Sequence, residues 1–86
     1  MPNVELYSTD WCPFCRRAEK LLSDKGIGFT KINLDDEPDR KEEMVNRTGR
    51  RTVPQIFIGG LHIGGCDDLY ALDDMGKLDP LLKSAS

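Results

Sequence analysis

The sequence has too few metal-binding and disulfide-forming residues for several common classes of small protein. Its 86 residues contain three cysteines and one histidine, whose spacing matches no common zinc-binding pattern. Three cysteines are also an odd number, and too few for a secreted scaffold held together by disulfides. The apolar runs are far shorter than the roughly 20 residues that a membrane-spanning helix needs. The composition therefore argues against a zinc module, a secreted disulfide scaffold and a membrane protein.

The sequence also lacks an excess of positive charge. Lys and Arg number 12 against 15 Asp and Glu, so the net charge is −3 and the isoelectric point is near 5.0. Binding to a nucleic-acid backbone needs a basic face, so we expect no nucleic-acid partner. With 38% hydrophobic and 31% charged residues, the chain has the composition of a soluble globular protein, and its length fits one domain over residues 1–86. No basic segment followed by an apolar one occurs at the start, so we expect no signal peptide and a reducing, cytoplasmic setting.

What the sequence does contain is a pair of cysteines at the expected start of a helix, in the stretch Trp11-Cys12-Pro13-Phe14-Cys15. Pro13 fits the first helical position, where a missing N–H is no loss, and this places Cys12 at the N-cap. The free N–H groups and the positive end of the helix dipole favour a negative charge there, so Cys12 should ionise more readily than a free thiol. Cys15 lies one turn further on and should be more buried. We predict an attacking thiol, Cys12, and a resolving thiol, Cys15, and prefer this interpretation to a structural metal site or to inert core cysteines.

Hydrophobic periodicity divides the chain into alternating strands and helices. Strands are expected at residues 4–8, 28–34, 53–58 and 61–63, and helices at residues 13–25, 38–48 and 66–76. Gly59-Gly60 predicts a hairpin between the last two strands, and Asp79-Pro80 predicts a final turn. The order β-α-β-α-β-β-α predicts an α/β fold with a four-stranded mixed sheet and helices on both faces. Cys12 then lies at the carboxyl end of the first strand, where sites in such sheets are found.

Three motifs occur in register along this order: Cys12-Pro13-Phe14-Cys15, Thr52-Val53-Pro54 and Gly64-Gly65-Cys66-Asp67-Asp68-Leu69. Together they resemble the glutaredoxin family, and more narrowly its small dithiol members from bacteria, over nearly the whole chain. The resemblance implies a thioredoxin-like fold, which agrees with the expected order of strands and helices. It also implies a thiol–disulfide oxidoreductase that uses glutathione as co-substrate and needs no metal.

The resemblance assigns roles to the second and third motifs. The Val53–Pro54 peptide is expected to be cis, which exposes the backbone of Val53 to an extended peptide. The helix start is expected to receive the γ-glutamyl end of glutathione, with its carboxylate on the N–H groups of Cys66 and Asp67 and its ammonium on the Asp67 side chain. Helix capping is the alternative role for the two aspartates of this motif, and both roles can hold for different residues. The residues expected to bind glutathione are Phe14, Thr52, Val53, Pro54, Gly65, Cys66 and Asp67.

The chain departs from the family pattern beside the cysteines. Many relatives carry Lys three positions before the first cysteine, where this chain has Thr9, and Tyr where it has Phe14. One expected cation for the thiolate or for the glycine carboxylate of glutathione is therefore missing. The candidates to replace it are Arg16, Arg47 and Arg51. Trp11 is also unusual, and we expect it either to widen an apolar surface for protein substrates or to pack on the loop.

The predicted reaction begins when the Cys12 thiolate attacks the glutathione sulfur of a mixed disulfide, after which a second glutathione releases oxidised glutathione. Cys15 resolves mixed disulfides formed with protein substrates. Expected partners are glutathione and glutathionylated or disulfide-containing proteins, with ribonucleotide reductase as one candidate, and the chain is expected to act as a monomer. Two alternatives stay open: recharging by thioredoxin reductase, and an iron–sulfur carrier in which Cys12 and glutathione are the ligands. Cys66 is expected to contribute backbone contact rather than catalysis, and His62 to be a solvated strand residue.

Overall fold

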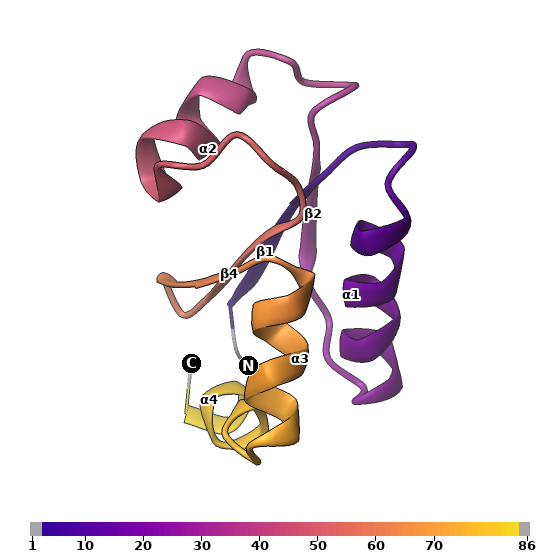
Figure 1. The fold of residues 1–86 in the computed structure, drawn as a ribbon, viewed down its shortest axis with the longest axis vertical. Coiled ribbons are helices and arrows are strands. Elements are labelled where there is room, and N and C mark those ends of the chain that lie inside the picture. The colour runs from indigo at the N-terminus through magenta and orange to yellow at the C-terminus, as the bar shows by residue number, and fades with distance from the viewer. Residues whose placement is uncertain (1–2, 85–86) are drawn as a thin grey trace.

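The structure is a computed structural model that describes residues 3–84. Strands and helices alternate through the first half of the chain, and a hairpin and two helices complete it (Figure 1). The elements are β1 (Val4–Ser8), α1 (Pro13–Asp24), β2 (Thr30–Asn33), α2 (Arg40–Thr48), β3 (Gln55–Ile58), β4 (Leu61–Gly64), α3 (Cys66–Asp74) and α4 (Leu78–Ser84). Within the described residues, no helix combines the length and apolar character that crossing a bilayer requires.

The strands form one four-stranded sheet in the order β2-β1-β3-β4. β1 is parallel to β2 and antiparallel to β3, while β3 and β4 form an antiparallel hairpin. The hairpin turns at Gly59 and Gly60, whose φ angles of 59° and 83° suit a two-residue turn that glycine adopts without strain. The mixed sheet and its hairpin therefore confirm the architecture expected from the sequence.

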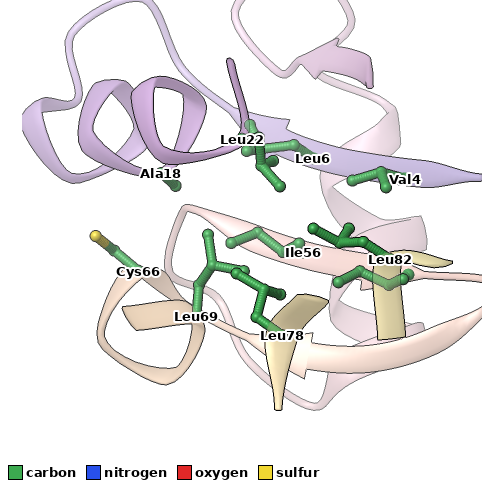
Figure 2. Packing of buried hydrophobic residues seen from close by; sticks show 10 residues of the cluster. Val4, Leu6, Ala18, Leu22, Ile56, Cys66, Leu69, Leu78 and Leu82 are labelled. Atoms are coloured by element: carbon green, nitrogen blue, oxygen red, sulfur yellow. The ribbon is translucent and has the colours of Figure 1, made fainter. Parts of the chain in front are cut away.

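Helices cover both faces of the sheet (Figure 1). On one face, α1, α3 and α4 pack against a buried apolar cluster in which Leu6 and Ile56 come from the sheet, Leu22 from α1 and Leu69 from α3 (Figure 2). On the opposite face, α2 buries Met44 in a smaller cluster. Burial on both faces fixes β1 and β3 at the centre of the sheet, and the loops that follow β1 and precede β3 carry the candidate site.

The C-terminal segment, the start of the second helix and the extent of the second strand differ from the expectation. Residues 78–84 form the helix α4 rather than only a turn, because Leu78 and Leu82 complete the larger apolar cluster. The second helix begins at Arg40 instead of Pro38, since Pro38 lies in a turn and Arg40 N–H closes it with a backbone hydrogen bond of 3.0 Å. The second strand covers only residues 30–33, because β1 pairs with no more of it.

Candidate active site

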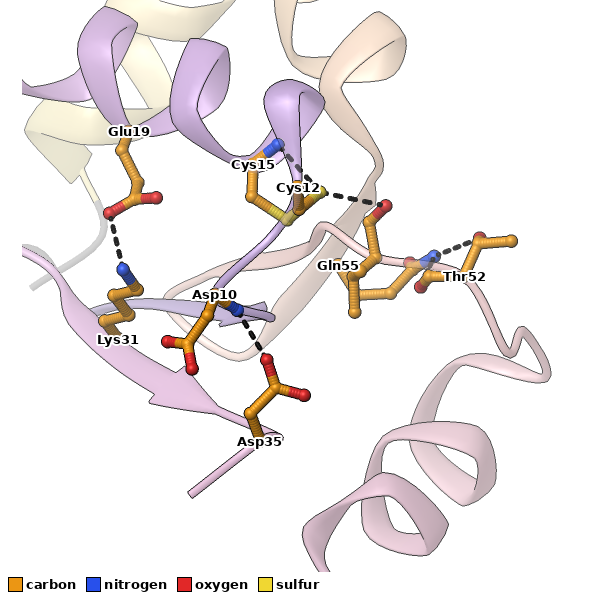
Figure 3. Close-up of a disulfide and its surroundings, with 9 residues drawn as sticks. Asp10, Cys12, Cys15, Glu19, Lys31, Asp35, Thr52 and Gln55 are labelled. Carbon is orange, nitrogen blue, oxygen red and sulfur yellow. Dashed lines mark hydrogen bonds and ion pairs between the residues drawn. A yellow bond between two sulfur atoms is a disulfide. The ribbon is translucent and has the colours of Figure 1, made fainter. Parts of the chain in front are cut away.

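The cysteine pair lies in the segment that joins β1 to α1 (Figure 3). Cys12 is the N-cap residue, with extended backbone angles of φ −143° and ψ 99°, and Pro13 is the first residue of α1. The Cys12 sulfur accepts a hydrogen bond from the Cys15 backbone N–H at 3.1 Å. The two sulfurs are joined in a disulfide, and the Cα atoms are 5.2 Å apart. The helix start and the N-cap position of Cys12 are thus confirmed.

Reduction of this disulfide leaves the two sulfurs in unequal surroundings. Cys12 is 7% exposed and Cys15 is 1% exposed, so Cys12 is the sulfur that a substrate reaches more easily. The Cys15 N–H and the positive end of α1 stabilise a negative charge on Cys12, and the first turn of α1 contains no acidic residue to oppose it. The arrangement can therefore supply a reactive thiolate with a buried second thiol behind it.

The loop before β3 packs against the disulfide. The Val53–Pro54 peptide is cis, as the family resemblance implies. Val53 O lies 3.8 Å from the Cys12 sulfur. β3 begins at Gln55 rather than at Val53, and the register with β1 ends at Gln55 as well. The backbone of Val53 is therefore outside the sheet pairing and beside the reactive sulfur.

The start of α3 forms the third part of the site. Gly65 is the N-cap residue, and the Asp68 carboxylate accepts its backbone N–H at 2.9 Å. This hydrogen bond is the main reason that the pKa of Asp68 lies below its ordinary 3.8, and the Arg50 guanidinium adds to the effect. Gly64 has a φ of 120°, and a Cβ there would overlap the Asp68 carboxylate, so the turn requires glycine. Asp68 is therefore the capping residue, while Asp67 is exposed at the helix start.

A groove of about 220 Å³ joins the loop before β3 to the start of α3. Every residue that the family resemblance assigned to glutathione lines it, namely Phe14, Thr52, Val53, Pro54, Gly65, Cys66 and Asp67. The groove also contains Arg50, Gln55 and Asp68, which were not among the residues expected to bind glutathione. The spacing of Asp68 from Gly65 marks it as a helix cap, whereas no local pattern places Arg50 or Gln55 in this groove.

Arg47 is not the cation that replaces the missing lysine. Its guanidinium lies 3.8 Å from the centroid of the Phe57 ring and donates hydrogen bonds to Tyr7 Oη at 2.9 Å and to a Glu5 carboxylate oxygen at 3.1 Å. Burial raises the pKa of Tyr7, and so does the Glu43 carboxylate, which accepts a hydrogen bond from the Tyr7 hydroxyl. Arg47 thus connects α2 to the sheet, and its guanidinium contacts these residues rather than the cysteines.

Two cations lie beside Thr9, on the other side of the loop from Cys66. Arg51 and Lys41 line a second hollow together with Thr9 and Val53. Lys41 was not among the candidates from the sequence, because it follows the loop after β2 and only the fold brings it near Thr9. The structure therefore leaves Arg51, joined by Lys41, next to the position where many relatives carry a lysine.

Trp11 extends the apolar surface around the cysteines instead of packing on the loop. Its side chain is 87% exposed, and Phe14 nearby is 53% exposed. A small hollow of about 110 Å³ is lined by Trp11, Cys12, Pro13 and Arg16. Arg16 therefore lies on the Trp11 side of Cys12, outside the groove that contains the start of α3.

His62 is not the solvated residue expected from the sequence. It is half-buried on β4, its ring centroid lies 5.1 Å from that of Phe57, and its Nε2 is 2.7 Å from Gln55 Oε1. Burial, followed by the positive charge of Arg50, lowers the pKa of His62 below 6.5. Cys66 is 5% exposed, and burial raises the pKa of its thiol, so Cys66 is poorly suited to act as a nucleophile. Among residues 3–84, no three His, Cys, Asp or Glu side chains are grouped to hold a metal ion.

Comparison with known proteins places this geometry in a family. The glutaredoxin family model matches residues 4–63. Glutaredoxin 3 of Escherichia coli K12 is 59% identical over 83 residues, which cover 96% of this chain and 100% of that protein. A glutaredoxin of Pseudomonas aeruginosa is 51% identical over 84 residues, with coverage of 98% and 100%.

Solved structures agree in three dimensions and confirm the thioredoxin-like fold. The crystal structure of a buckwheat glutaredoxin–glutathione complex superposes with a TM-score of 0.91 at 37% identity, covering 98% of this chain and 79% of that one. The solution structure of glutaredoxin from Brucella melitensis gives a TM-score of 0.85 at 52% identity, with coverage of 98% and 91%. Sequence and structure therefore agree that the chain belongs to the glutaredoxin family of thiol–disulfide oxidoreductases.

Proposed function

We propose that this glutaredoxin is glutathione-dependent and that it reduces glutathione mixed disulfides and protein disulfides through Cys12 and Cys15. The groove is the observation that carries the proposal. It brings together an anion-binding helix start and loop backbone that lies outside the sheet pairing, and the loop touches the reactive cysteine. Glutathione has a carboxylate and an ammonium at one end, a cysteine in the middle and a second carboxylate at the other end. The buckwheat relative, whose crystal structure is a glutathione complex, supports the same ligand for this chain.

The γ-glutamyl end of glutathione fits the start of α3. The backbone N–H groups of Cys66 and Asp67 belong to the first turn, where the helix dipole favours a carboxylate. The exposed Asp67 side chain supplies the negative charge for the ammonium beside it. Asp68 is committed to the Gly65 N–H, so we assign the ammonium to Asp67 alone.

The cysteine of glutathione fits beside Val53. An extended peptide can hydrogen-bond to the Val53 N–H and C=O in the manner of an added strand, and its sulfur then lies near Cys12, since Val53 O is 3.8 Å from the Cys12 sulfur. The glycine carboxylate is directed towards the hollow on the other side of the loop, where Arg51 and Lys41 carry positive charge. These two cations take the role that the lysine at the Thr9 position has in many relatives.

The proposed reaction is two successive thiol–disulfide exchanges. The Cys12 thiolate attacks the glutathione sulfur of a mixed disulfide. A bond between Cys12 and glutathione forms, the bond to the protein sulfur breaks, and the protein thiolate leaves and takes up a proton. A second glutathione thiolate then attacks the glutathione sulfur held by Cys12. Oxidised glutathione leaves, and Cys12 returns as a thiolate.

Protein disulfides follow a route that needs both cysteines. Cys12 attacks one protein sulfur, and a mixed disulfide forms while the other protein thiolate is released. Cys15 lies within bonding distance of Cys12, so its thiolate can attack the Cys12 sulfur and free the reduced protein. The resulting Cys12–Cys15 disulfide is reduced by two glutathione molecules, which leave as oxidised glutathione.

The same proposal includes the cellular setting expected from the sequence. The protein acts as a cytoplasmic monomer without a nucleic-acid or membrane partner, and needs no metal. Its substrates are glutathionylated and disulfide-containing proteins, with ribonucleotide reductase as one candidate. Gel filtration and fractionation of the producing cells test the oligomeric state and the location independently of the chemistry.

Turnover of a glutathionylated peptide, coupled to glutathione reductase and NADPH, tests the proposal directly. We expect Cys12→Ser to abolish turnover because no nucleophile remains. Cys15→Ser should retain deglutathionylation, which needs no resolving thiol, and should lose the reduction of insulin disulfides. Replacing glutathione and its reductase by thioredoxin reductase is the control. Full turnover in that control, or equal loss of deglutathionylation in both variants, would contradict the proposal.

A further inference from the structure

Gln55 is a buried amide in the lining of the groove. It is the first residue of β3 and only 1% exposed. A buried primary amide destabilises the fold unless its donors and its acceptor find partners. The Gln55 Nε2 group donates to Thr52 O at 3.1 Å and to Thr52 Oγ1 at 3.3 Å. Figure 3 shows the Gln55 and Thr52 side chains next to each other. Its Oε1 lies 2.7 Å from His62 Nε2.

These contacts determine which atom is the donor at each step. Thr52 O is a carbonyl oxygen and can only accept, so the amide nitrogen of Gln55 must face Thr52 and the amide oxygen must face His62. His62 Nε2 must therefore carry the proton that it shares with Gln55 Oε1. His62 pairs with Phe57 across the β-hairpin, and the two ring centroids are 5.1 Å apart. The Phe57 ring therefore restricts the movement of the imidazole.

The chain of hydrogen bonds ends at atoms that face a ligand. Thr52 C=O and Val53 N–H belong to the same planar peptide unit, so a bond that fixes the carbonyl also fixes the direction of the N–H. The Thr52 hydroxyl oxygen accepts a hydrogen bond from the Gln55 amide N–H, so the hydroxyl's own proton points away from Gln55. Val53 O, on the next peptide, lies 3.8 Å from the Cys12 sulfur. The orientation of the binding loop thus depends on side chains that do not touch the sulfur.

We propose that Gln55 and His62 are positioning residues that hold the Thr52–Val53 peptide, and with it the Val53 N–H and the Thr52 hydroxyl, in the orientation that receives a glutathione-containing disulfide. This inference rests on the proposed function and adds two residues to it. Neither residue contacts Cys12 by hydrogen bond or ion pair in the described structure. They therefore act on recognition of the glutathione backbone and not on the reactivity of the thiolate.

Single-turnover kinetics test this assignment. Reduced protein is mixed with oxidised glutathione or with bis(2-hydroxyethyl) disulfide, and the reaction is followed by the fluorescence of Trp11, the single tryptophan. We expect Gln55→Leu to lower the rate constant for oxidised glutathione about tenfold and His62→Leu to lower it about threefold, as the loss of buried hydrogen bonds implies. The rate with the neutral disulfide should change less than about twofold, because that substrate has no peptide backbone to orient.

Two further variants separate positioning from general damage. His62→Gln retains an N–H donor and should restore most of the rate that His62→Leu loses. Leu61→Ala, at a 55% exposed position on the same strand, should match the wild type. Nuclear magnetic resonance of ¹⁵N-labelled histidine should show the Nε2-protonated tautomer of His62.

Three results would overturn the inference: equal slowing with both disulfides, unchanged rates in Gln55→Leu, or a His62→Gln variant as slow as His62→Leu. Failure of the proposed function is distinguishable, since the wild type itself would then show no preference for oxidised glutathione over the neutral disulfide. A wild-type preference that survives in every variant would refute the positioning role alone.

Discussion

Asp67→Ala and Asp68→Ala should separate ligand selectivity from helix stability, although the two residues are adjacent on α3. Both substitutions remove one negative charge from the first turn of α3, so the loss of interaction with the helix dipole largely cancels between them. Only Asp68→Ala removes the acceptor of the Gly65 N–H at 2.9 Å and the partner of Arg50 at 3.3 Å. Each of the two variants is therefore a control for the other, because both lose the same charge and only one loses the helix cap.

The expected magnitudes follow from these contacts. Loss of a helix cap costs about 1 kcal/mol of unfolding free energy, so Asp68→Ala should melt about 4–8 °C below Asp67→Ala for a domain of this size. Asp67 is exposed, and an exposed ion pair with the γ-glutamyl ammonium contributes about 0.2–1 kcal/mol. Asp67→Ala should therefore raise the KM for a glutathione mixed disulfide by a factor of about 1.4 to 5. Its reaction with a small neutral disulfide should stay nearly unchanged, because that substrate has no ammonium.

Thermal unfolding and the coupled glutathione reductase assay measure the two effects. The pKa of Asp68 is lowered in the folded protein, mainly by the Gly65 N–H, so its stabilising effect is complete above its ordinary value of 3.8 and is lost as the pH falls through the folded value. The difference in Tm between the two variants should consequently shrink in acid. Equal Tm losses at neutral pH, or equal slowing of Asp67→Ala with charged and neutral substrates, would refute the division of roles.

Three further predictions concern residues outside the ligand contacts. Iodoacetamide should modify Cys12 of the reduced protein well before Cys66, whose thiol is buried and has a raised pKa; peptide mapping that finds equal labelling would contradict this. Ser8→Ala should leave the Tm unchanged or raise it, because the Ser8 hydroxyl is buried and has no hydrogen-bond partner among the described residues, and a loss above about 1 kcal/mol would reveal a missed partner. Arg47→Ala should lower the free energy of unfolding by about 1–2 kcal/mol, because the contact with the Phe57 ring and the hydrogen bonds are lost. The KM for a glutathione mixed disulfide should stay unchanged, and a raised KM would show that Arg47 contributes to glutathione binding.

Short sequence patterns were enough to predict most helices and strands of this protein and the cysteine pair of its site. Proline after Cys12 marks a helix start, and the N-cap position of a cysteine there follows from the ordinary geometry of helix termini. Gly59-Gly60 predicts the hairpin because few other residues adopt two consecutive positive φ angles. The place of Cys15 one turn into α1 predicts that it is more buried than Cys12, and the two residues are 1% and 7% exposed. Three motifs in register then indicated the family, and with it seven of the ten residues that line the groove.

Only the tertiary structure decided how side chains distant in sequence are used. Arg47, Arg51 and Lys41 are all cations near one another in the chain, yet the fold places Arg47 against Phe57 and the other two beside Thr9. The sequence likewise left the capping and binding roles of the two aspartates on α3 open, because both lie in the same helical turn. The sequence predicts a solvated His62. In the structure, β4 pairs with β3, and this pairing brings the His62 ring to Gln55. A side chain's hydrogen-bond partners, its burial and the charges near it depend on contacts between separate helices and strands. The pattern of residues along one helix or strand cannot predict such contacts.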